Sequence, residues 1–482
     1  MKQLYITYQV KPINIFLMVL FIIMISCSEN ILDEIDNNPN NPEEVPVQSL
    51  IPNVTSGVPY YLEASDIAWY SSVFSEHNAG TNGRMYELDL RSGINSKLSE
   101  NAWLNLYAST LKNLKTIIDR VSEGGAEEGN YQYKGIAQVL YAYTFSAATD
   151  LFGRIPYSEA LKGKENRQPK YDKQEDIYND LQKILDSAIV NLSKSSIQTP
   201  GEEDFIYEGN TDMWIKASWA LKARLYNHLS KRDAQNSAIN ALQCLQNAFE
   251  SKSDEMVFDK WSSSEDISHQ NPWYRMRNAF SISKTLYDLL NNNSDPRKSK
   301  MITIAYDSNA YVPALNGDAE LDVNSSKYSN ISYNVLQPNT PIPLISYVEI
   351  LFIKAECNLR LGNYDVAFMA YQQAISQDLQ DYGMSIESAL NNDVFFDNVL
   401  AMAPQNLTLE DIITQKFIAL WPFQSIEVYT DWRRTGIPSL QNPLGEPPRR
   451  FPYPQNEIST NGNNVPDVQL TEGVWWDDGT ED

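Results

Sequence analysis

Hydrophobic residues recur every three or four positions in several long stretches of this chain, a spacing typical of amphipathic helices. Two such stretches, 346–361 and 364–379, are separated by Gly362, and glycine readily adopts the left-handed conformation that ends a helix. The pattern therefore predicts two helices that fold back on each other. Small and aromatic residues occur at the offsets of a helix-turn-helix repeat of the tetratricopeptide kind: Ala355, Gly362, Tyr364, Ala367, Tyr371 and Ala374.

Repeats of this kind cannot bury their apolar faces alone, so the chain should contain further helix pairs. The same spacing occurs in 131–151 and 177–192, which we expect to pair antiparallel, and again in 211–231 and 233–249. Thr408 and Asp411 have the spacing of a capping box and predict a last helix over 408–420. The predicted fold is mostly α, a tetratricopeptide-like scaffold of helical hairpins with long irregular loop insertions.

Two stretches interrupt the helical pattern. Residues 77–96 are rich in glycine and asparagine and are predicted to form a loop, and residues 251–343 are polar, turn-rich and aromatic apart from 280–290. Long irregular stretches inside a globular protein usually have a function, so both are candidate ligand-binding regions. The chain becomes proline-rich after Gly436 and ends near Trp475 and Trp476, which we expect to clamp this tail to the core.

The N-terminus has the pattern of an export signal. Lys2 and Lys11 precede an apolar run over 15–25, which is too short to span a bilayer and ends at Ser26-Cys27. Residues 24–27 resemble a bacterial lipobox, in which Cys27 would carry the lipid anchor; the alternative is an uncleaved anchor with an incidental cysteine. We therefore divide the chain into a signal peptide (1–26), a flexible polar tether (27–46) and a single domain (47–482) with its insertion at about 251–343.

Composition removes several classes of function. The formal net charge of −24 argues against nucleic acid as a partner, because phosphate binding needs a basic surface. Cys244 and Cys357 lie inside helical patterns and are expected to be buried thiols rather than a disulfide. Three histidines cannot supply a metal cluster with them, so we expect no cofactor. The acidity would allow a structural calcium ion, although no EF-hand spacing is present.

Several motifs occur in a characteristic order. After the lipobox come Asp-Leu-Phe-Gly-Arg-Ile-Pro-Tyr at 150–157, Asp-Pro-Arg at 295–297, the helix pair at 346–379, Asp-Trp-Arg-Arg-Thr-Gly at 431–436 and Arg-Arg-Phe-Pro-Tyr-Pro-Gln-Asn-Glu at 449–457. Together they resemble the SusD/RagB family of Bacteroidetes outer-membrane lipoproteins, from Cys27 to about Glu457. We expect the residues of 150–157, with Arg433 and Arg434, to stabilise the scaffold.

The resemblance implies a cell-surface lipoprotein of the outer membrane. Its repeat helices would dock onto a SusC-like TonB-dependent transporter, and its loops would capture an oligosaccharide or, in some members, a peptide. Sugars present apolar ring faces surrounded by hydroxyl groups, so a sugar site needs flat aromatic rings beside amide, carboxylate or guanidinium groups. Two segments have that mixture and supply the candidate ligand-binding residues: His77, Asn82, Arg84 and Tyr86, with Asn271, Trp273, Tyr274 and Arg275.

Alternatives remain open at this stage. Trp273 and Tyr274 could instead pack against the helix that comes after them, and Arg84 and Tyr86 could belong to a solvated loop. The leading hypothesis is a nutrient-binding protein without catalysis, with glycan preferred to peptide because of the aromatic loops. A helical glycoside hydrolase is the rival, since abundant carboxylates could supply an acid and a base, but His77, His228 and His269 have no motif partner. A scaffold that binds only protein would leave the aromatic insertion unexplained.

Overall fold

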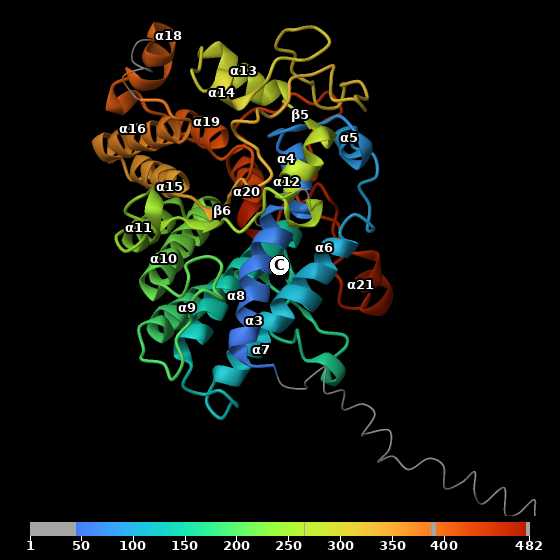
Figure 1. The fold of residues 1–482 in the computed structure, drawn as a ribbon, viewed down its shortest axis with the longest axis vertical. Helices are drawn as coiled ribbons and strands as arrows, with labels where there is room; N and C mark the ends of the chain where they lie inside the picture. Colours follow the sequence, from blue (N-terminus) through green and yellow to red (C-terminus); the bar gives the residue numbers. More distant parts are fainter. Residues whose placement is uncertain (1–44, 265, 386, 388–391, 479–482) are drawn as a thin grey trace, which may run out of the picture. The chain divides into compact units, whose positions relative to one another are not determined.

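The computed structural model of the chain describes residues 45–264, 266–385, 387 and 392–478, so the predicted signal peptide, Cys27 and most of the tether lie outside the described residues. Residues Val47–Asp482 form one compact unit. This unit is built mainly from helices, with three two-stranded sheets in the part of the chain described (Figure 1). The predicted mostly α fold is confirmed.

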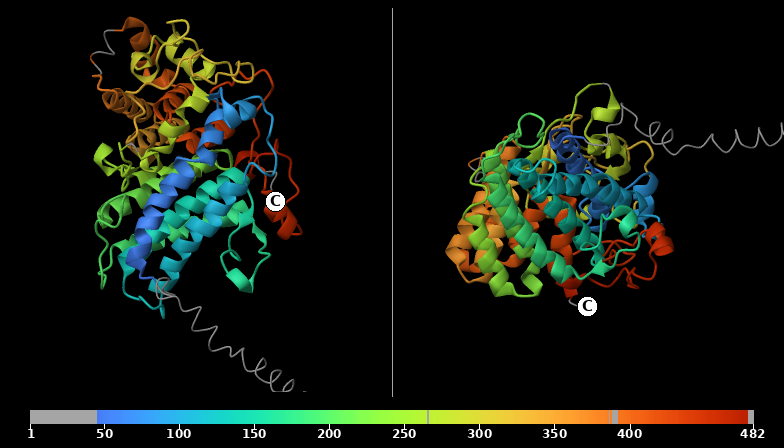
Figure 2. Two further views of the ribbon diagram at one scale, coloured as in Figure 1. Left: turned by 45° about the vertical axis from the view of Figure 1, so that its right-hand side comes forward. Right: turned by 90° about the horizontal axis from the view of Figure 1, so that it is seen from below.

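Three helical hairpins form the scaffold. They are α8 (Tyr131–Phe152) with α9 (Gln174–Leu192), α10 (Thr211–His228) with α11 (Ala234–Leu245), and α15 (Tyr347–Arg360) with α16 (Tyr364–Asp381). Successive hairpins stack, because α9 contacts α10 and α11 contacts α15. Figure 2 shows this stack from two further sides, from the teal and green helices of the first hairpin to the orange helices of the third. The three predicted antiparallel pairs are thus confirmed, and Gly362 has the expected left-handed conformation, with φ 75°.

The N-terminal helices, three of which pack on α8, come before the first hairpin in the chain. They are α3 (Val47–Val58) with its π-helical continuation η1 (Pro59–Glu63), α4 (Asp66–Phe74), α6 (Glu100–Leu104), and η2 (Asn105–Leu111) with α7 (Lys112–Val121). Helix α3 packs on α7 and α8. Near the other end of the chain, α19 (Leu409–Ala419) packs on α15 and α20 (Ser425–Thr435) packs on α4. Helix α19 begins at the predicted capping box of Thr408 and Asp411.

The insertion leaves and re-enters the scaffold through one small sheet. Strand β4 (Met256–Phe258) comes after the second hairpin, β6 (Ile342–Ile345) precedes the third, and the two pair antiparallel with Met256 opposite Ile345. This pairing joins the ends of the excursion, so the third hairpin can stack directly on the second. Between these strands lie α12 (Pro272–Met276), η7 (Arg277–Ala279), β5 (Phe280–Ser281), α13 (Lys284–Asn292) and α14 (Lys298–Met301).

The prediction that residues 77–96 form only a loop is wrong. The segment contains β1 (Ala79–Gly80) and a short helix, α5 (Gly83–Asp89). Strand β1 pairs antiparallel with β5 of the insertion, about 200 residues later, so local composition carried no sign of it. Gly80 permits a tight approach, because a Cβ atom there would lie 2.0 Å from the carbonyl oxygen of Met85.

The C-terminal segment is fixed to the first two hairpins, as predicted. Trp476 in α22 (Trp475–Asp478) is fully buried, and its indole N–H donates to Asp150 Oδ1 at 2.8 Å. The guanidinium of Arg232 lies 4.6 Å from the ring centroid of Trp475. Other short elements include β2 (Ile155–Pro156), which pairs with β3 (Tyr171–Asp172), η3 (Gly163–Glu165), α18 (Asp393–Phe395) and α21 (Gln455–Thr460).

Cys244 and Cys357 are buried free thiols, which confirms the prediction made for them. Burial raises the pKa of the Cys244 thiol to about 11 and that of Cys357 to about 12, so both stay protonated at neutral pH. None of the helices that the structure describes has both the length and the hydropathy that a bilayer span requires.

Candidate ligand-binding surface

The structure brings together the two segments from which ligand contacts were expected. Besides the pairing of β1 with β5, the backbone N–H groups of Thr81 and Asn82 both donate to the carbonyl oxygen of Ala279, at 3.0 and 3.4 Å. Helix α5 therefore lies beside η7, which comes directly after α12 (Figure 1). We call the surface formed by α4, α5, α12 and η7 the upper surface.

Arg84 is the exposed cation of α5. Its guanidinium lies 5.7 Å from the ring centroid of Tyr70 on α4, a geometry that allows a cation–π contact. Partial burial raises the pKa of the neighbouring Asp66 carboxyl. The charge of Arg84 and hydrogen bonds from Asn101 and Tyr70 offset part of this rise. The result is a carboxyl group and a guanidinium close together at the surface, with the buried Tyr70 ring behind them, and such polar groups suit hydroxyl-rich ligands.

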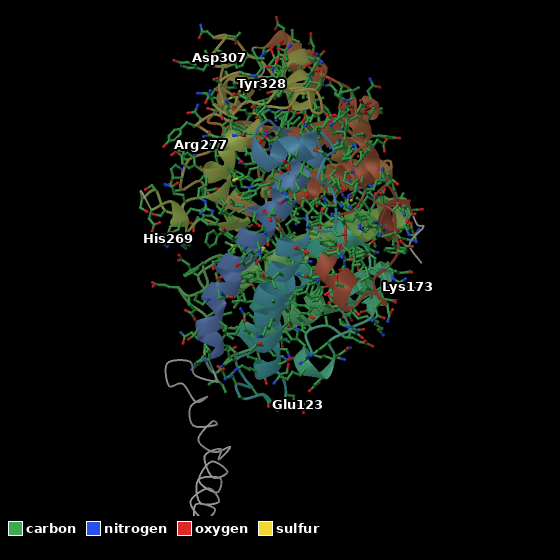
Figure 3. The ribbon with its side chains drawn as sticks, turned by 90° about the vertical axis from the view of Figure 1, so that its right-hand side faces the viewer. Glu123, Lys173, His269, Arg277, Asp307 and Tyr328 are labelled. Atoms are coloured by element: carbon green, nitrogen blue, oxygen red, sulfur yellow. The ribbon has the colours of Figure 1, made fainter. Side chains whose placement is uncertain are left out.

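The insertion contributes a second ring and cation. Tyr274 on α12 is half-buried, and the guanidinium of Arg277 lies 3.9 Å from its ring centroid while donating to its carbonyl oxygen at 2.5 Å. Figure 3 shows Arg277 on the upper part of this face, below Tyr328 and Asp307 of the insertion. Arg275 is exposed on the same short helix, and Asn82 and Tyr86 are half-buried on the α5 side. Five of the predicted residues thus lie on the upper surface: Asn82, Arg84, Tyr86, Tyr274 and Arg275.

Three other predicted ligand-binding residues, His77, Asn271 and Trp273, are fully buried, which corrects the expectation that they contact a ligand. His77 is fully buried with its Nε2 2.8 Å from the carbonyl oxygen of Phe417, and burial lowers its pKa to about 3, so the ring is neutral. Asn271 is fully buried, where its side chain accepts from the N–H of Trp273 at 2.8 Å and donates to the carbonyl oxygen of Thr340 at 2.7 Å. Because a ligand contacts only exposed atoms, we remove both from the candidate site.

Trp273 is likewise fully buried and fastens the insertion to the scaffold. Its indole N–H donates to the carbonyl oxygen of Glu63, the last residue of η1, at 2.7 Å. Its ring lies edge-on to Trp69 on α4, with centroids 6.5 Å apart. Trp273 therefore packs in the core, although against α4 and η1 rather than the helix that comes after it, and we remove this residue from the candidate site as well.

Trp273→Phe should lower the free energy of unfolding by about 1–3 kcal/mol, because the Glu63 carbonyl oxygen loses its donor in a buried place. Urea unfolding followed by tryptophan fluorescence and circular dichroism measures this loss. Tyr274→Phe, one residue away on the half-buried side, serves as the control and should change stability by less than about 0.5 kcal/mol. Unchanged stability of Trp273→Phe together with weaker glycan binding would contradict the packing role.

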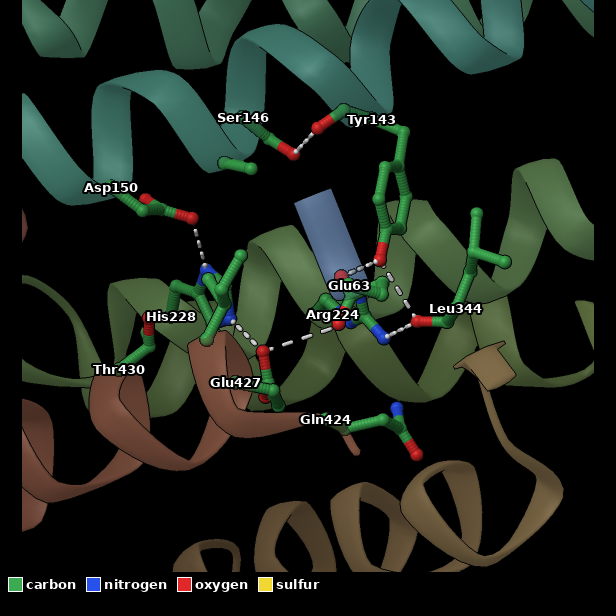
Figure 4. A pocket seen from close by; sticks show the side chains of 12 residues that line it. Glu63, Tyr143, Ser146, Asp150, Arg224, His228, Leu344, Gln424, Glu427 and Thr430 are labelled. Atoms are coloured by element: carbon green, nitrogen blue, oxygen red, sulfur yellow. Dashed lines mark hydrogen bonds and ion pairs between the residues drawn. The ribbon is translucent and has the colours of Figure 1, made fainter. Parts of the chain in front are cut away.

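The scaffold also encloses a cluster of charged side chains (Figure 4). The cavity at its centre has a volume of about 20 Å³ and is lined by Glu63, Tyr143, Asp150, Arg224, His228 and Glu427, among others. A single water molecule needs about 10–15 Å³, so the cavity has room for about one water and none for a sugar unit. The cluster therefore cannot be the active site of the glycoside hydrolase considered as the rival function.

Ion pairs fill this cluster. His228 lies 2.9 Å from Glu427 and 3.3 Å from Asp150; burial alone would lower its pKa, but these two carboxylates raise the pKa to about 9. Lys416 bridges Glu427 at 2.8 Å and Asp431 at 2.7 Å. Arg433 and Arg434 are also buried, and they donate to the Asp150 carbonyl oxygen at 2.5 Å and to Glu356 at 2.8 Å, so Asp150, Arg433 and Arg434 hold the scaffold together as expected.

Sequence reasoning missed two contributors to the upper surface, Asp66 and Arg277, and the buried Tyr70 ring that supports Arg84. Asp66 and Tyr70 are four residues apart on α4, which places them on one helix face, but nothing in the sequence indicated that Arg84 would lie against them. In the described residues, no group of three or more His, Cys, Asp or Glu side chains has the arrangement of a metal site.

Comparison with known families and structures adds independent evidence. Residues 39–454 match the SusD-like family described as starch-binding associating with outer membrane. A SusD/RagB family protein from Bacteroides thetaiotaomicron is 28% identical, with a TM-score of 0.80 over 91% of this chain and 100% of that one. A chitin-binding protein is 25% identical, with a TM-score of 0.72 over 89% of this chain and 100% of its own.

A chitin-binding SusD homologue from Flavobacterium johnsoniae is 21% identical and has the same fold, with a TM-score of 0.73 over 89% of this chain and 98% of that chain. No curated protein gave a significant match. Because the family match covers most of the sequence and the fold agrees, the chain belongs to the SusD-like family.

Proposed function

We propose that the protein is a cell-surface lipoprotein of the outer membrane that captures an oligosaccharide on the upper surface and delivers it to a SusC-like TonB-dependent transporter. The observation that supports the ligand site is the joining of two distant segments, which brings α5, with Arg84 and Tyr86, beside η7 and the neighbouring α12, with Tyr274 and Arg275. The lipobox-like sequence ending at Cys27 supports lipid anchoring, and the family description supports association with the outer membrane.

The ligand class is inferred from chemistry and from relatives. Tyrosine rings flanked by guanidinium and amide groups suit the apolar faces and hydroxyl edges of sugars. A relative 25% identical to this chain is a chitin-binding protein, so oligomers of N-acetylglucosamine are the first ligands to test. The protein would bind without catalysis, since its role is to hold the glycan for the transporter.

Replacing both Arg84 and Tyr274 by alanine should weaken the binding of N-acetylglucosamine hexamer at least about tenfold, which corresponds to about 1.4 kcal/mol. Isothermal titration calorimetry on the exported chain measures the affinity, and circular dichroism confirms that the fold is retained. The control is Tyr364→Ala, which removes a 42% exposed ring at the start of α16 on the scaffold and should leave the affinity unchanged.

Three outcomes would contradict the proposal. Unchanged glycan affinity in the double variant would remove the upper surface as the site. Shortened glycan products after incubation would contradict a role without catalysis. Binding of peptides in the absence of any glycan binding would replace the proposed ligand class by the alternative one.

A further inference from the structure

A groove runs along the first hairpin, away from the upper surface. Its main hollow has a volume of about 680 Å³ and is lined by α7, α8, α9 and the loop 157–165. That volume lies within the range of about 300–1,000 Å³ common for small-ligand sites. In Figure 1, α7 and α9 lie in the lower part of the ribbon, whereas α5 and α12 lie in the upper part. The hollow is therefore separate from the upper surface.

The floor of the hollow is apolar and firmly held. Tyr141 on α8, which is 9% exposed, lines it together with Ile118 of α7 and Ile184 of α9. The Phe145 ring lies between Tyr141 and Tyr157, with centroid separations of 4.7 and 4.8 Å and edge-on geometry to both. Because the buried Phe145 holds both tyrosines, the apolar atoms that Tyr141 and Tyr157 present to the hollow are fixed before any ligand arrives, which suits the apolar face of a pyranose ring.

The rim of the hollow is held by hydrogen bonds. The Tyr157 phenol donates to Asp180 Oδ2 at 2.5 Å, which ties the loop to α9. The backbone N–H groups of Tyr157 and Ser158 donate to Asp172 Oδ2 at 3.1 and 2.8 Å, which ties the same loop to β3. The loop is thus held in position on both sides of the hollow.

The groove continues past this rim. A second hollow of about 610 Å³ shares Tyr157, Ser158 and Asp180 with the first and extends to Asn179 and Lys183 on α9. The two hollows meet at the Tyr157–Asp180 pair, so a chain-like ligand that lies across this pair would contact both. Five carboxylates and three lysines line the two hollows, so neither a strongly anionic nor a strongly cationic polymer is favoured.

Leu161, in the loop 157–165, has a backbone conformation that is unusual for a leucine. Its φ of 63° lies in the left-handed region, which costs free energy for any residue with a Cβ and is far easier for glycine or asparagine. Its side chain is half-buried and lines the main hollow. It also packs against the core, so it forms a fixed apolar part of the wall of the hollow.

From these observations we infer that the groove is a second carbohydrate-binding site, which takes a neutral oligosaccharide with one sugar face on Tyr141 and Leu161 and hydroxyl groups at Asp180 and Ser158. The inference rests on the proposed function for the class of ligand. A glycan chain engaged at the groove and at the upper surface would be held more tightly than at either alone, by raising the effective concentration of the second contact.

Hydrogen–deuterium exchange tests the two sites separately. With saturating N-acetylglucosamine hexamer, or with cellohexaose or maltohexaose if that is the glycan bound, residues 157–165 and 112–121 should become protected, as should 83–89 and 272–276. In the Arg84→Ala, Tyr274→Ala double variant, protection should persist in the groove segments alone. Leu161→Asn, which suits the left-handed backbone, should keep the fold and lower groove affinity at least about fivefold.

The outcomes separate the inference from the proposed function. Protection of 83–89 and 272–276 without any protection of 157–165 would overturn the second site and leave the proposed function standing. Protection of the groove alone would support the inference and contradict the upper surface as the capture site. Full groove affinity in Leu161→Asn, or protection by peptides and by none of the glycans, would also overturn the inference.

Discussion

Arg434→Met is expected to lower the free energy of unfolding by about 3–5 kcal/mol, the usual cost of removing one partner from a buried ion pair. Arg434 is almost fully buried and donates to Glu356 at 2.8 Å and to Asp431 at 2.7 Å. Although burial favours the protonated form of Glu356, Arg434 and Arg360 hold its pKa at about 2. Methionine fills much of the same space but removes the guanidinium that the two buried carboxylates share, so that, among the cations of the described residues, Glu356 keeps only Arg360 and Asp431 keeps only Lys416.

Urea unfolding measures this loss as a shift of the midpoint at constant slope. The matched control is Lys327→Met, which breaks the pair with Glu320 in the insertion, where both side chains are exposed; the change there should stay below about 1 kcal/mol. The double variant Arg434→Met, Glu356→Gln should lose less free energy of unfolding than the sum of the losses in the two single variants. The second substitution removes the charge of a carboxylate that the first leaves without Arg434. Equal stability of Arg434→Met and Lys327→Met would contradict the buried network.

The helical pattern could not predict that network. Arg224, Glu349, Lys416 and Glu427 lie on helices, and a charged position in an amphipathic pattern is normally assigned to the solvent side. Stacking of hairpins against α19 and α20 turns these positions inward, where Arg224 meets Glu349 at 2.6 Å and Lys416 meets Glu427 at 2.8 Å. Most of the partners are distant in sequence, so nothing near each charged residue in the sequence indicates that it forms a buried ion pair.

The scaffold itself was predictable because its signals are local. Apolar spacing located the hairpin helices to within a few residues, and Gly362 marked the tightest turn. The resumption of helical spacing at 346 also predicted that 251–343 is an excursion between hairpins, and β4 and β6 pair near the two ends of this stretch. What the sequence concealed were elements defined by distant partners, above all β1 and α5, whose backbone contacts come from residues 279–281.

For the upper surface, the sequence identified the right segments but could not sort their side chains. Successive residues of a helix point about 100° apart, so Trp273 and Tyr274 differ in burial although they are neighbours on the same short helix. Trp273 is directed to the core, where its N–H donates to Glu63, and Tyr274 is left half-buried under Arg277. The orientation of α12 against α4 and η1 decides which of the two adjacent rings faces solvent. Local composition does not predict that orientation.

Stability should fall as the pH rises from about 4.5 to 9, because several buried groups hold their protons more tightly in the folded state. Burial raises the pKa of the Glu63 carboxyl from 4.5 to about 7, against a hydrogen bond from Tyr143. Between these values the unfolded chain releases a proton that the folded chain retains, so folding loses free energy as the pH increases. For Glu63 the loss by pH 7 is on the order of 3 kcal/mol.

His228 extends the decline to higher pH. Its pKa rises from 6.5 to about 9, so the stabilisation that its charge contributes is complete below pH 6.5 and is lost as the pH approaches 9. Glu356 acts in the opposite sense, since its pKa of about 2 lies below the ordinary 4.5 and its contribution is lost only below that value. Stability should consequently be greatest near about pH 5, at the acid side of neutrality.

The variant Glu63→Gln isolates one contribution to this profile. Glutamine does not titrate, and Oε2 of Glu63 has no hydrogen-bond partner within the described part of the chain, so the substitution loses no bond at that atom. Urea unfolding from pH 5 to 8 should show the decline reduced by about 2–3 kcal/mol relative to the wild type, whereas the further decline from pH 8 to 9, due to His228, should remain. A control substitution of the exposed Glu320 by Gln should leave the whole profile unchanged. Two results would contradict this prediction: a wild-type stability that rises between pH 5 and 8, or a Glu63→Gln profile that matches the wild type. Either would mean that Glu63 is ionised in the folded protein at low pH and that the cluster is hydrated.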